Sequence, residues 1–194
     1  MNVKRERWVQ LFLGLLLLWC YAYFLPRRQD WNQNGRLDLV LAVVDQGTLA
    51  IDAYVGNTGD YARFGEHYYS DKAPGASFLG IPFYALFRTL ANAPLIGEGL
   101  RVVAAGAAPG PPSAQELAGI FPWRGYFALA LYATTLGAIA LPSTLLGLLV
   151  YRLARRLGNS AGHAALLTII YGLGTMAFPY GGAFYGPMLA AACL

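Results

Sequence analysis

The segment 67–75 (HYYSDKAPG) gathers a histidine, a carboxylate and a lysine within nine residues. A lysine ammonium is a compact charge that suits a phosphate or pyrophosphate group, so Lys72 is our candidate for binding one. Asp71 or His67 could bind a divalent cation, the one cofactor that we expect, which would also neutralise phosphate charge. Because Asp71 and Lys72 are adjacent, we expect their side chains to diverge. The simpler alternative is a lysine that reaches lipid headgroups beside a capping aspartate.

Two more carboxylates, Asp38 and Asp45, interrupt the strongly apolar segment 37–49. Seven residues are nearly two helical turns, so both acids fall on one face of a helix that Gly47 is well placed to end. We expect this helix to lie at a membrane surface, with its acids turned toward protein or water. A solvated polar stripe is an equally simple interpretation of the same spacing.

Tyrosines and carboxylates alternate through the following stretch, which also contains Asn57 and Gly59. Aromatic rings stack on sugars and carboxylates accept hydrogen bonds from hydroxyl groups, so the pattern suits a sugar substrate. The residues that we expect to contact it are Asp45, Asp52, Asp60 and Tyr69. The alternative is that Asn, Gly and Asp here form tight turns and nothing more.

The composition indicates the setting of these residues. Hydrophobic residues make up 57% of the chain and charged residues 12%, against roughly a quarter charged in soluble proteins. The apolar residues come in blocks, which indicates an integral membrane protein. The net charge of +4 does not indicate a nucleic-acid partner, because the basic residues flank apolar blocks instead of forming a patch. Cys20 and Cys193 lie in such blocks and are interpreted as inert.

Three blocks are candidate membrane spans, 8–25, 125–151 and 163–180. Lys4, Arg5 and Arg7 precede the first, which is typical of an uncleaved signal anchor. We therefore expect an all-α membrane protein with three parts. They are an anchor helix in 1–25, an extracytoplasmic loop over 26–124 with interfacial helices near 37–49 and 76–90, and two to three further transmembrane helices in 125–194.

Charge sets the expected orientation. The basic turn at 152–162 belongs in the cytoplasm together with the N-terminus, so 26–124 lies outside the cytoplasmic (inner) membrane. The apolar piece 76–90 is then interfacial or re-entrant, with Arg88 at the water side. In the competing topology it is a true span and the basic turn lies outside. The segment 93–122 is rich in Ala, Gly and Pro, and we expect a loop without a site there.

This order of parts resembles the N-terminal region of the GT-C superfamily of polytopic glycosyltransferases, especially the branch related to protein O-mannosyltransferases and aminoarabinose transferases. The residues Tyr69-Ser70-Asp71-Lys72-Ala73-Pro74 look like the Tyr-Phe-Glu-Lys-Pro type motif of those enzymes, and 152–156 looks like their basic turn. The resemblance covers only the first part of such an enzyme. Since the last apolar stretch also stops at Leu194, we expect the chain to be a fragment.

The resemblance implies transfer of a sugar from a polyprenyl-phosphate carrier, with membrane lipid as the other partner. A carboxylate would take the proton of the acceptor hydroxyl, and Lys72 would stabilise the leaving phosphate. Asn32 stands where the family's first acid would fall, so Asp38 is the expected base. The family's second acid would fall near 184–186, where this chain has none. The alternative is a non-catalytic polytopic protein, such as a transporter subunit or assembly factor, whose outer loop is a docking surface.

Overall fold

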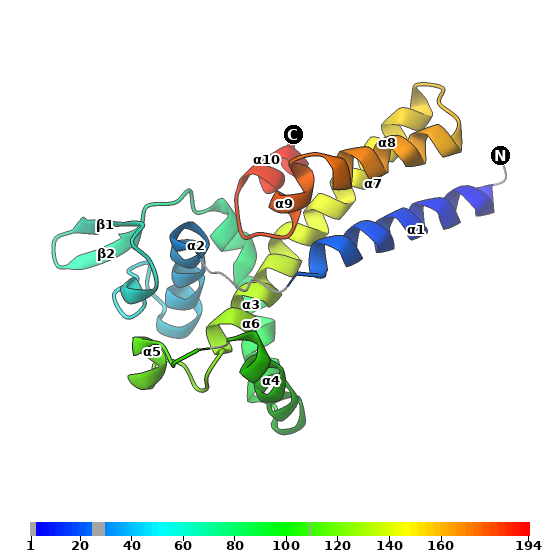
Figure 1. The fold of residues 1–194 in the computed structure, drawn as a ribbon. Coiled ribbons are helices and arrows are strands. Elements are labelled where there is room, and N and C mark those ends of the chain that lie inside the picture. The colour runs from blue at the N-terminus through cyan, green and yellow to red at the C-terminus, as the bar shows by residue number, and fades with distance from the viewer. Residues whose placement is uncertain (1–2, 25–29, 109) are drawn as a thin grey trace. The chain divides into compact units, whose positions relative to one another are not determined.

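The computed structural model describes residues 3–24, 30–108 and 110–194. It is mostly helical, and its described strands form one short hairpin, which confirms the expected all-α class (Figure 1). The chain divides into two compact units. Unit 1 comprises residues 1–24 and 139–194, and unit 2 comprises residues 25–138.

Unit 1 is built on three longer helices and two short ones. They are α1 (Val3–Ala22), α7 (Leu141–Arg156), α8 (Ala161–Gly174), α9 (Ala177–Gly181) and α10 (Pro187–Cys193). Helix α1 covers most of the predicted anchor 8–25, while Leu25 itself lies outside the described residues. Helix α8 is shorter than the predicted span 163–180, because it ends at Gly174 and a separate short helix follows.

Glycines let α1 pack closely on its neighbours in unit 1. The buried Leu17 fits against Gly147 of α7 and Gly172 of α8, where an added Cβ would lie 2.5 Å from a Leu17 methyl carbon in each case. One turn later the Tyr21 hydroxyl donates to the Gly172 carbonyl oxygen at 3.1 Å. Small residues at helix crossings allow such close approach. These contacts fix the position of α1 in unit 1.

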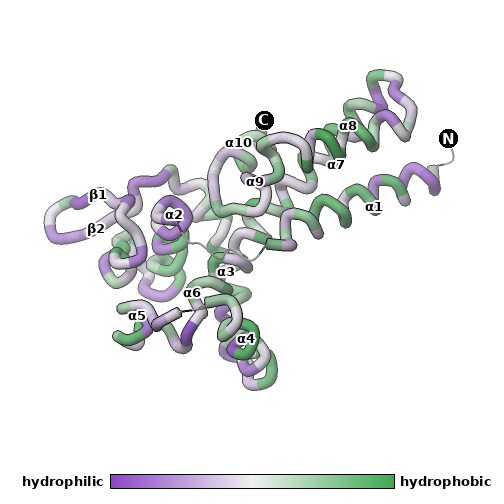
Figure 2. Tube along the Cα trace, viewed as in Figure 1, coloured by the Kyte–Doolittle hydropathy of each residue, from purple (hydrophilic) through white to green (hydrophobic). Residues whose placement is uncertain are grey.

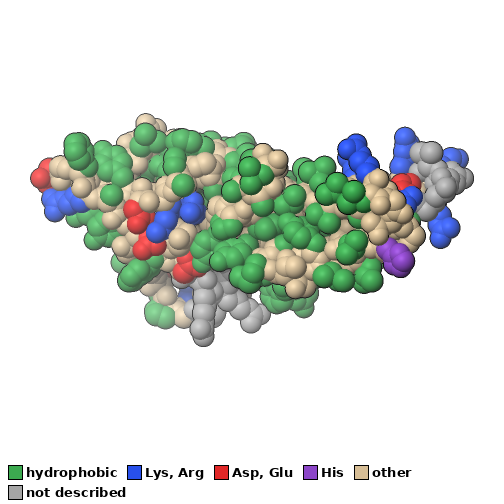
Figure 3. All heavy atoms as spheres, turned by 90° about the horizontal axis from the view of Figure 1, so that it is seen from above, with side chains coloured by type: hydrophobic (Ala, Val, Ile, Leu, Met, Phe, Trp, Pro, Cys, Tyr) green, Lys and Arg blue, Asp and Glu red, His purple; other side chains and the backbone are tan. Residues whose placement is uncertain are grey.

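A polar cluster lies where α1 begins and α7 ends. Glu6 accepts hydrogen bonds from the Tyr151 hydroxyl at 2.8 Å and from Arg155 Nε at 3.0 Å. Arg152 Nε donates to Gln10 Oε1 at 3.0 Å. The two basic segments therefore share one end of unit 1, and Lys and Arg side chains gather there on the face shown in Figure 3. The arginines belong to the last turns of α7, and the turn itself follows them at Gly158 (φ 87°).

Only one described helical segment is long and apolar enough to cross a membrane. It is Tyr126–Arg156, which joins α6 (Tyr126–Thr135), the π-helical η3 (Leu136–Ala140) and α7. A second is added if α3 (Gly75–Asn92) and α4 (Pro94–Ala107), which meet at 103°, count as one broken span or re-entrant loop.

Helix α2 (Trp31–Leu41) is the central element of unit 2. Asp30 caps its N-terminus by accepting from the Gln33 backbone N–H at 2.9 Å. The helix widens into the π-helical η1 (Ala42–Gln46) and stops at Gly47, whose φ of 68° suits glycine. Protein buries every residue from Gln33 to Leu41, so α2 is an interior helix instead of the expected surface helix at 37–49.

The prediction of an irregular loop over 93–122 was wrong. Helix α4 begins with Pro94 at its first position, where proline is tolerated, and is rich in alanine. The short α5 (Ala114–Leu117) begins with a capping box, which Ser113 and Glu116 form at its N-terminus. The prolines and glycines of this stretch lowered the expectation of helix, although Pro94 lies at the first position of α4.

Helices α3 and α4 carry exposed apolar side chains, whereas the hairpin is largely hydrophilic (Figure 2). The exposed residues include Leu79, Leu86, Leu90, Leu95, Val102 and Val103. Helix α3 occupies the predicted 76–90 almost without change. An apolar surface of this kind on a helix pair is typical of contact with lipid or with another protein.

Candidate functional site

Lys72 lies between two carboxylates at the surface of unit 2. Its Nζ is 2.8 Å from Asp60 Oδ2 and 3.2 Å from Asp71 Oδ1. The Lys72 side chain is 19% exposed, and those of Asp60 and Asp71 are 31% and 39% exposed. The hydrogen bond that the Lys72 ammonium donates to Asp60 raises the pKa of Lys72, so the ammonium stays charged at physiological pH. The expectation that Asp71 and Lys72 would diverge was wrong.

A β-hairpin brings Asp60 to this lysine. Strand β1 (Tyr61–Phe64) pairs antiparallel with β2 (His67–Ser70), and Tyr61 lies opposite Ser70. Asp60 precedes the first strand and Asp71 follows the second, so the pairing makes them neighbours. Gly65 makes the tight turn between the strands with a φ of 61°. The cluster of Asp60, Asp71 and Lys72 therefore depends on the register of this hairpin.

Helix α2 holds the segment that carries Lys72. Arg36 Nη1 donates to the Ala73 carbonyl oxygen at 2.9 Å, and Ser77 Oγ donates to the Arg36 carbonyl oxygen at 2.9 Å. Gly35 lets the loop approach closely, because a Cβ there would lie 3.1 Å from the Asp60 carbonyl oxygen. Sequence reasoning missed all three residues, since none carries a recognisable motif.

Asp52 and His67 form a second surface pair. His67 Nδ1 lies 2.7 Å from Asp52 Oδ2, and the Tyr68 backbone N–H donates to Asp52 Oδ1 at 2.7 Å. The Tyr68 hydrogen bond, followed by that to His67, lowers the pKa of Asp52. His67 and Asp71, the predicted metal ligands, thus have different partners. The described residues hold no group of three or more His, Cys, Asp or Glu side chains that could bind a metal ion.

Asp38, the expected base, lies inside unit 2 with no exposed surface. Its Oδ1 accepts from Asn57 Nδ2 at 2.9 Å, whereas its Oδ2 has no partner among the described residues. Burial raises the pKa of the Asp38 carboxyl well above its usual range. Asn34, one turn earlier on α2, donates to the Asn57 carbonyl oxygen at 2.7 Å and leaves its own Oδ1 unpartnered.

Asp45 and its partner Tyr84 together connect four segments of unit 2. Its Oδ2 accepts from the Tyr84 hydroxyl at 2.8 Å and from the Tyr54 hydroxyl at 3.2 Å. Arg88 Nε lies 3.0 Å from Oδ1 as an ion pair without hydrogen-bond alignment. The Tyr84 hydroxyl also lies 3.1 Å from that of Tyr126. Asp45 and Asp38 therefore have separate partners, although the sequence predicted a common face.

Of the predicted residues, the structure brings together Asp60, Asp71 and Lys72, and separately Asp52 and His67. Tyr69 is half-buried on β2, opposite Ala62.

Comparison of the chain with protein-family models, with curated proteins and with solved structures finds no match.

Proposed function

We propose that the chain is part of a membrane glycosyltransferase that transfers a sugar from a polyprenyl-phosphate donor to an acceptor hydroxyl. The single observation that carries this proposal is the lysine ammonium held between two partly exposed carboxylates, Asp60 and Asp71. The positive charge of Lys72, which can stabilise a leaving phosphate, then lies beside a carboxylate that can accept a proton. The resemblance of 69–74 to the GT-C motif supports the same chemistry.

Lys72 would stabilise the leaving group. As the acceptor oxygen bonds to the anomeric carbon, the bond from that carbon to the phosphate oxygen breaks and the polyprenyl phosphate leaves with the electron pair. A protonated, fixed ammonium stabilises the charge that develops on that oxygen. The hydrogen bonds from Arg36 and Ser77 support this role, because they hold the Lys72 segment against α2.

Exposure favours Asp60 over Asp38 as the base. A base must come within hydrogen-bond distance of the proton that it removes. Asp60 is partly exposed beside Lys72, whereas Asp38 has no exposed surface and is bonded to Asn57. In our proposal Asp60 takes the acceptor proton, and Asp38 supports the interior of unit 2.

The proposal uses no metal ion. A divalent cation would bind between the carboxylates of Asp60 and Asp71, and the Lys72 ammonium already lies there. The two acids with this lysine therefore do not fit a metal site.

The proposed setting is the cytoplasmic membrane, with the N-terminus in the cytoplasm and residues 26–124 outside. The apolar surfaces of α3 and α4 would then contact the lipid interface, which is where a polyprenyl-phosphate headgroup lies. The basic end of α1 and α7 would face the anionic inner leaflet.

The test measures release of polyprenyl phosphate from donors with radiolabelled mannose, glucose or arabinose, using membranes that carry the protein. Each transfer releases one polyprenyl phosphate whichever hydroxyl accepts the sugar, so the loss of labelled sugar from the lipid measures release without knowledge of the acceptor. We expect Lys72→Ala and Asp60→Asn each to lower release by about 10²-fold or more. Lys4→Ala is the matched control, since Lys4 is the other lysine of the chain, and its release should equal that of the wild type.

Asp38→Asn separates the two candidate bases. If Asp60 is the base, Asp38→Asn retains release. Loss of release in Asp38→Asn with retention in Asp60→Asn would instead make Asp38 the base. Unchanged release in Lys72→Ala would reject the phosphate role, and no release from any donor would reject the transfer reaction.

A further inference from the structure

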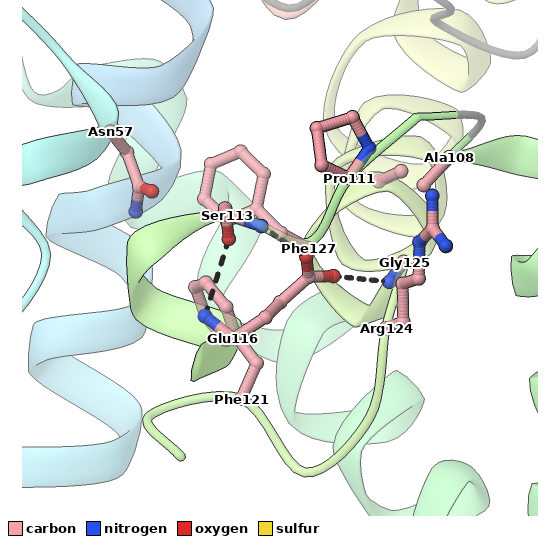
Figure 4. Close-up of a pocket in the computed structure, with 10 residues that line it drawn as sticks. Asn57, Ala108, Pro111, Ser113, Glu116, Phe121, Arg124, Gly125 and Phe127 are labelled. Atoms are coloured by element: carbon pink, nitrogen blue, oxygen red, sulfur yellow. Dashed lines mark hydrogen bonds between the residues drawn. The ribbon is translucent and has the colours of Figure 1, made fainter. Parts of the chain in front are cut away.

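A pocket of about 190 Å³ lies in unit 2, and part of its lining comes from the stretch 93–122, where no site was expected. Asn57 lines it together with residues from the end of α4, the α5 segment and the start of α6 (Figure 4). Its polar side chains are those of Asn57, Ser113, Glu116 and Arg124, and its rings are Phe121 and Phe127. In Figure 4, Asn57 and Arg124 lie on opposite sides of Glu116.

Arg124 is the one cation among the described residues of unit 2 that has no acceptor. Every other described lysine or arginine of this unit bonds to a carboxylate or a carbonyl group. The pairs are Arg36 with Ala73, Arg63 with Glu66, Lys72 with Asp60, Arg88 with Asp45, and Arg101 with Glu98. A guanidinium presents five donors and no acceptor, so a free one that lines a pocket favours an anion.

Glu116 shares the pocket but does not neutralise Arg124. Its Oε2 accepts from the Ser113 backbone N–H at 2.7 Å, and its Oε1 accepts from the Gly125 backbone N–H at 2.6 Å. Both oxygens of the Glu116 carboxylate are therefore occupied by backbone N–H groups, one before α5 and one before α6. The result is a fixed frame in which the Arg124 guanidinium has no acceptor among residues 30–108 and 110–138.

We propose that this pocket binds a phosphate or carboxylate group carried by a small, hydroxylated ligand. Its volume lies below the roughly 300–1,000 Å³ of sites for drug-sized molecules, so it suits about one ring with its charged group. Arg124 pairs with the anion. Asn57 donates its Nδ2 to Asp38, which leaves its Oδ1 free to accept from a ligand hydroxyl. This site does not depend on the transfer reaction proposed above.

The experiment measures binding to the protein in phosphatidylcholine nanodiscs. Glucose 6-phosphate and glucuronate are titrated as soluble anions, and glucose is titrated as the uncharged control. In a second arm, phosphatidic acid replaces part of the phosphatidylcholine, and native mass spectrometry counts the retained lipid. We expect Arg124→Ala to weaken anion binding about tenfold or more, and Arg124→Lys to weaken it less.

Arg101→Ala is the control, because Arg101 is also an exposed arginine of unit 2 but pairs with Glu98. It should bind like the wild type. Dependence on Arg124 in the soluble arm identifies a free anion, and dependence in the lipid arm identifies a headgroup. Equal binding of glucose and glucose 6-phosphate, or anion binding that Arg124→Ala leaves unchanged in both arms, would overturn the proposal. Circular dichroism melting verifies that each variant folds.

Discussion

At the scale of single residues, Asp38 and Lys72 show how position decides the chemistry of a charged group. Lys72 is partly exposed and held by two carboxylates, so it keeps its proton. Asp38 has no exposed surface and one hydrogen bond, so the folded state favours its neutral form. Because the unfolded chain ionises Asp38 near its ordinary pKa, the fold binds a proton there that the unfolded chain releases.

Stability should therefore fall as pH rises from about 4 towards the raised pKa of Asp38. We expect Asp38→Asn to remove this penalty, since an amide keeps the acceptor for Asn57 and carries no charge. The gain in the free energy of unfolding over wild type should be absent near pH 4 and grow towards pH 8. Denaturant unfolding at the two pH values measures it.

Asp38→Ala serves as the comparison, because it removes the acceptor for Asn57 as well. It should be less stable than Asp38→Asn by about 1–3 kcal/mol at both pH values. A gain for Asp38→Asn that is the same at pH 4 and pH 8 would contradict the assignment of a neutral buried carboxyl.

Residue types were easier to predict than their partners. The sequence singled out Lys72, Asp60, Asp52 and His67 because charged side chains are conspicuous in an apolar chain. It could not pair Lys72 with Asp60, since that contact depends on the register of a hairpin with four-residue strands. Arg124 was passed over because a single arginine in a Pro- and Gly-rich stretch has no distinguishing pattern.

At the scale of elements, the join between α2 and α3 positions the proposed reaction centre. Ser77 is 1% exposed and donates to the Arg36 carbonyl oxygen, while Arg36 donates to Ala73. These bonds link the first turn of α3 to the middle of α2. Lys72 lies on the short segment between the end of the hairpin at Ser70 and the start of α3 at Gly75.

Ser77→Ala should lower the stability of unit 2 by about 1–2 kcal/mol, because it removes a buried hydrogen bond. The melting temperature should fall by about 2–4 °C or more. Thr89→Ala is the matched control on the same helix, since the exposed Thr89 hydroxyl bonds only to Ala85 of its own helix. Equal melting temperatures for the two variants would show that the join contributes nothing.

The elements themselves were predicted unevenly. Helix α3 was found almost to its bounds, and Gly47 was correctly chosen as the end of a helix, because apolar runs and glycine stops are local signals. Helix α4 was missed because the stretch 93–122 is rich in Ala, Gly and Pro, although Pro94 lies at the first position of the helix, where proline is tolerated. The burial of α2 was missed too, since its neighbours come from α3 and the hairpin.

At the scale of the whole molecule, the proposed topology predicts which residues a membrane-impermeant reagent reaches. Glu66 lies at the exposed turn of the hairpin, and Leu157 follows α7 with 74% exposure. In a background where Cys20 and Cys193 are replaced by serine, a maleimide added to intact spheroplasts should label Glu66→Cys. It should label Leu157→Cys only after permeabilisation. The reverse pattern, or labelling of both without permeabilisation, would reject the topology.

Unit 1 is assembled from the first and last parts of the chain, and this fixes an order of events during synthesis. The Tyr21 hydroxyl bonds to a carbonyl group 151 residues later, and Leu17 packs against glycines of α7 and α8. At about 5–20 residues per second, the synthesis of α1 is finished roughly 8–30 s before Gly172 exists. The continuous unit 2 is synthesised entirely within that interval. During that interval Leu17 therefore lacks its packing partners Gly147 and Gly172.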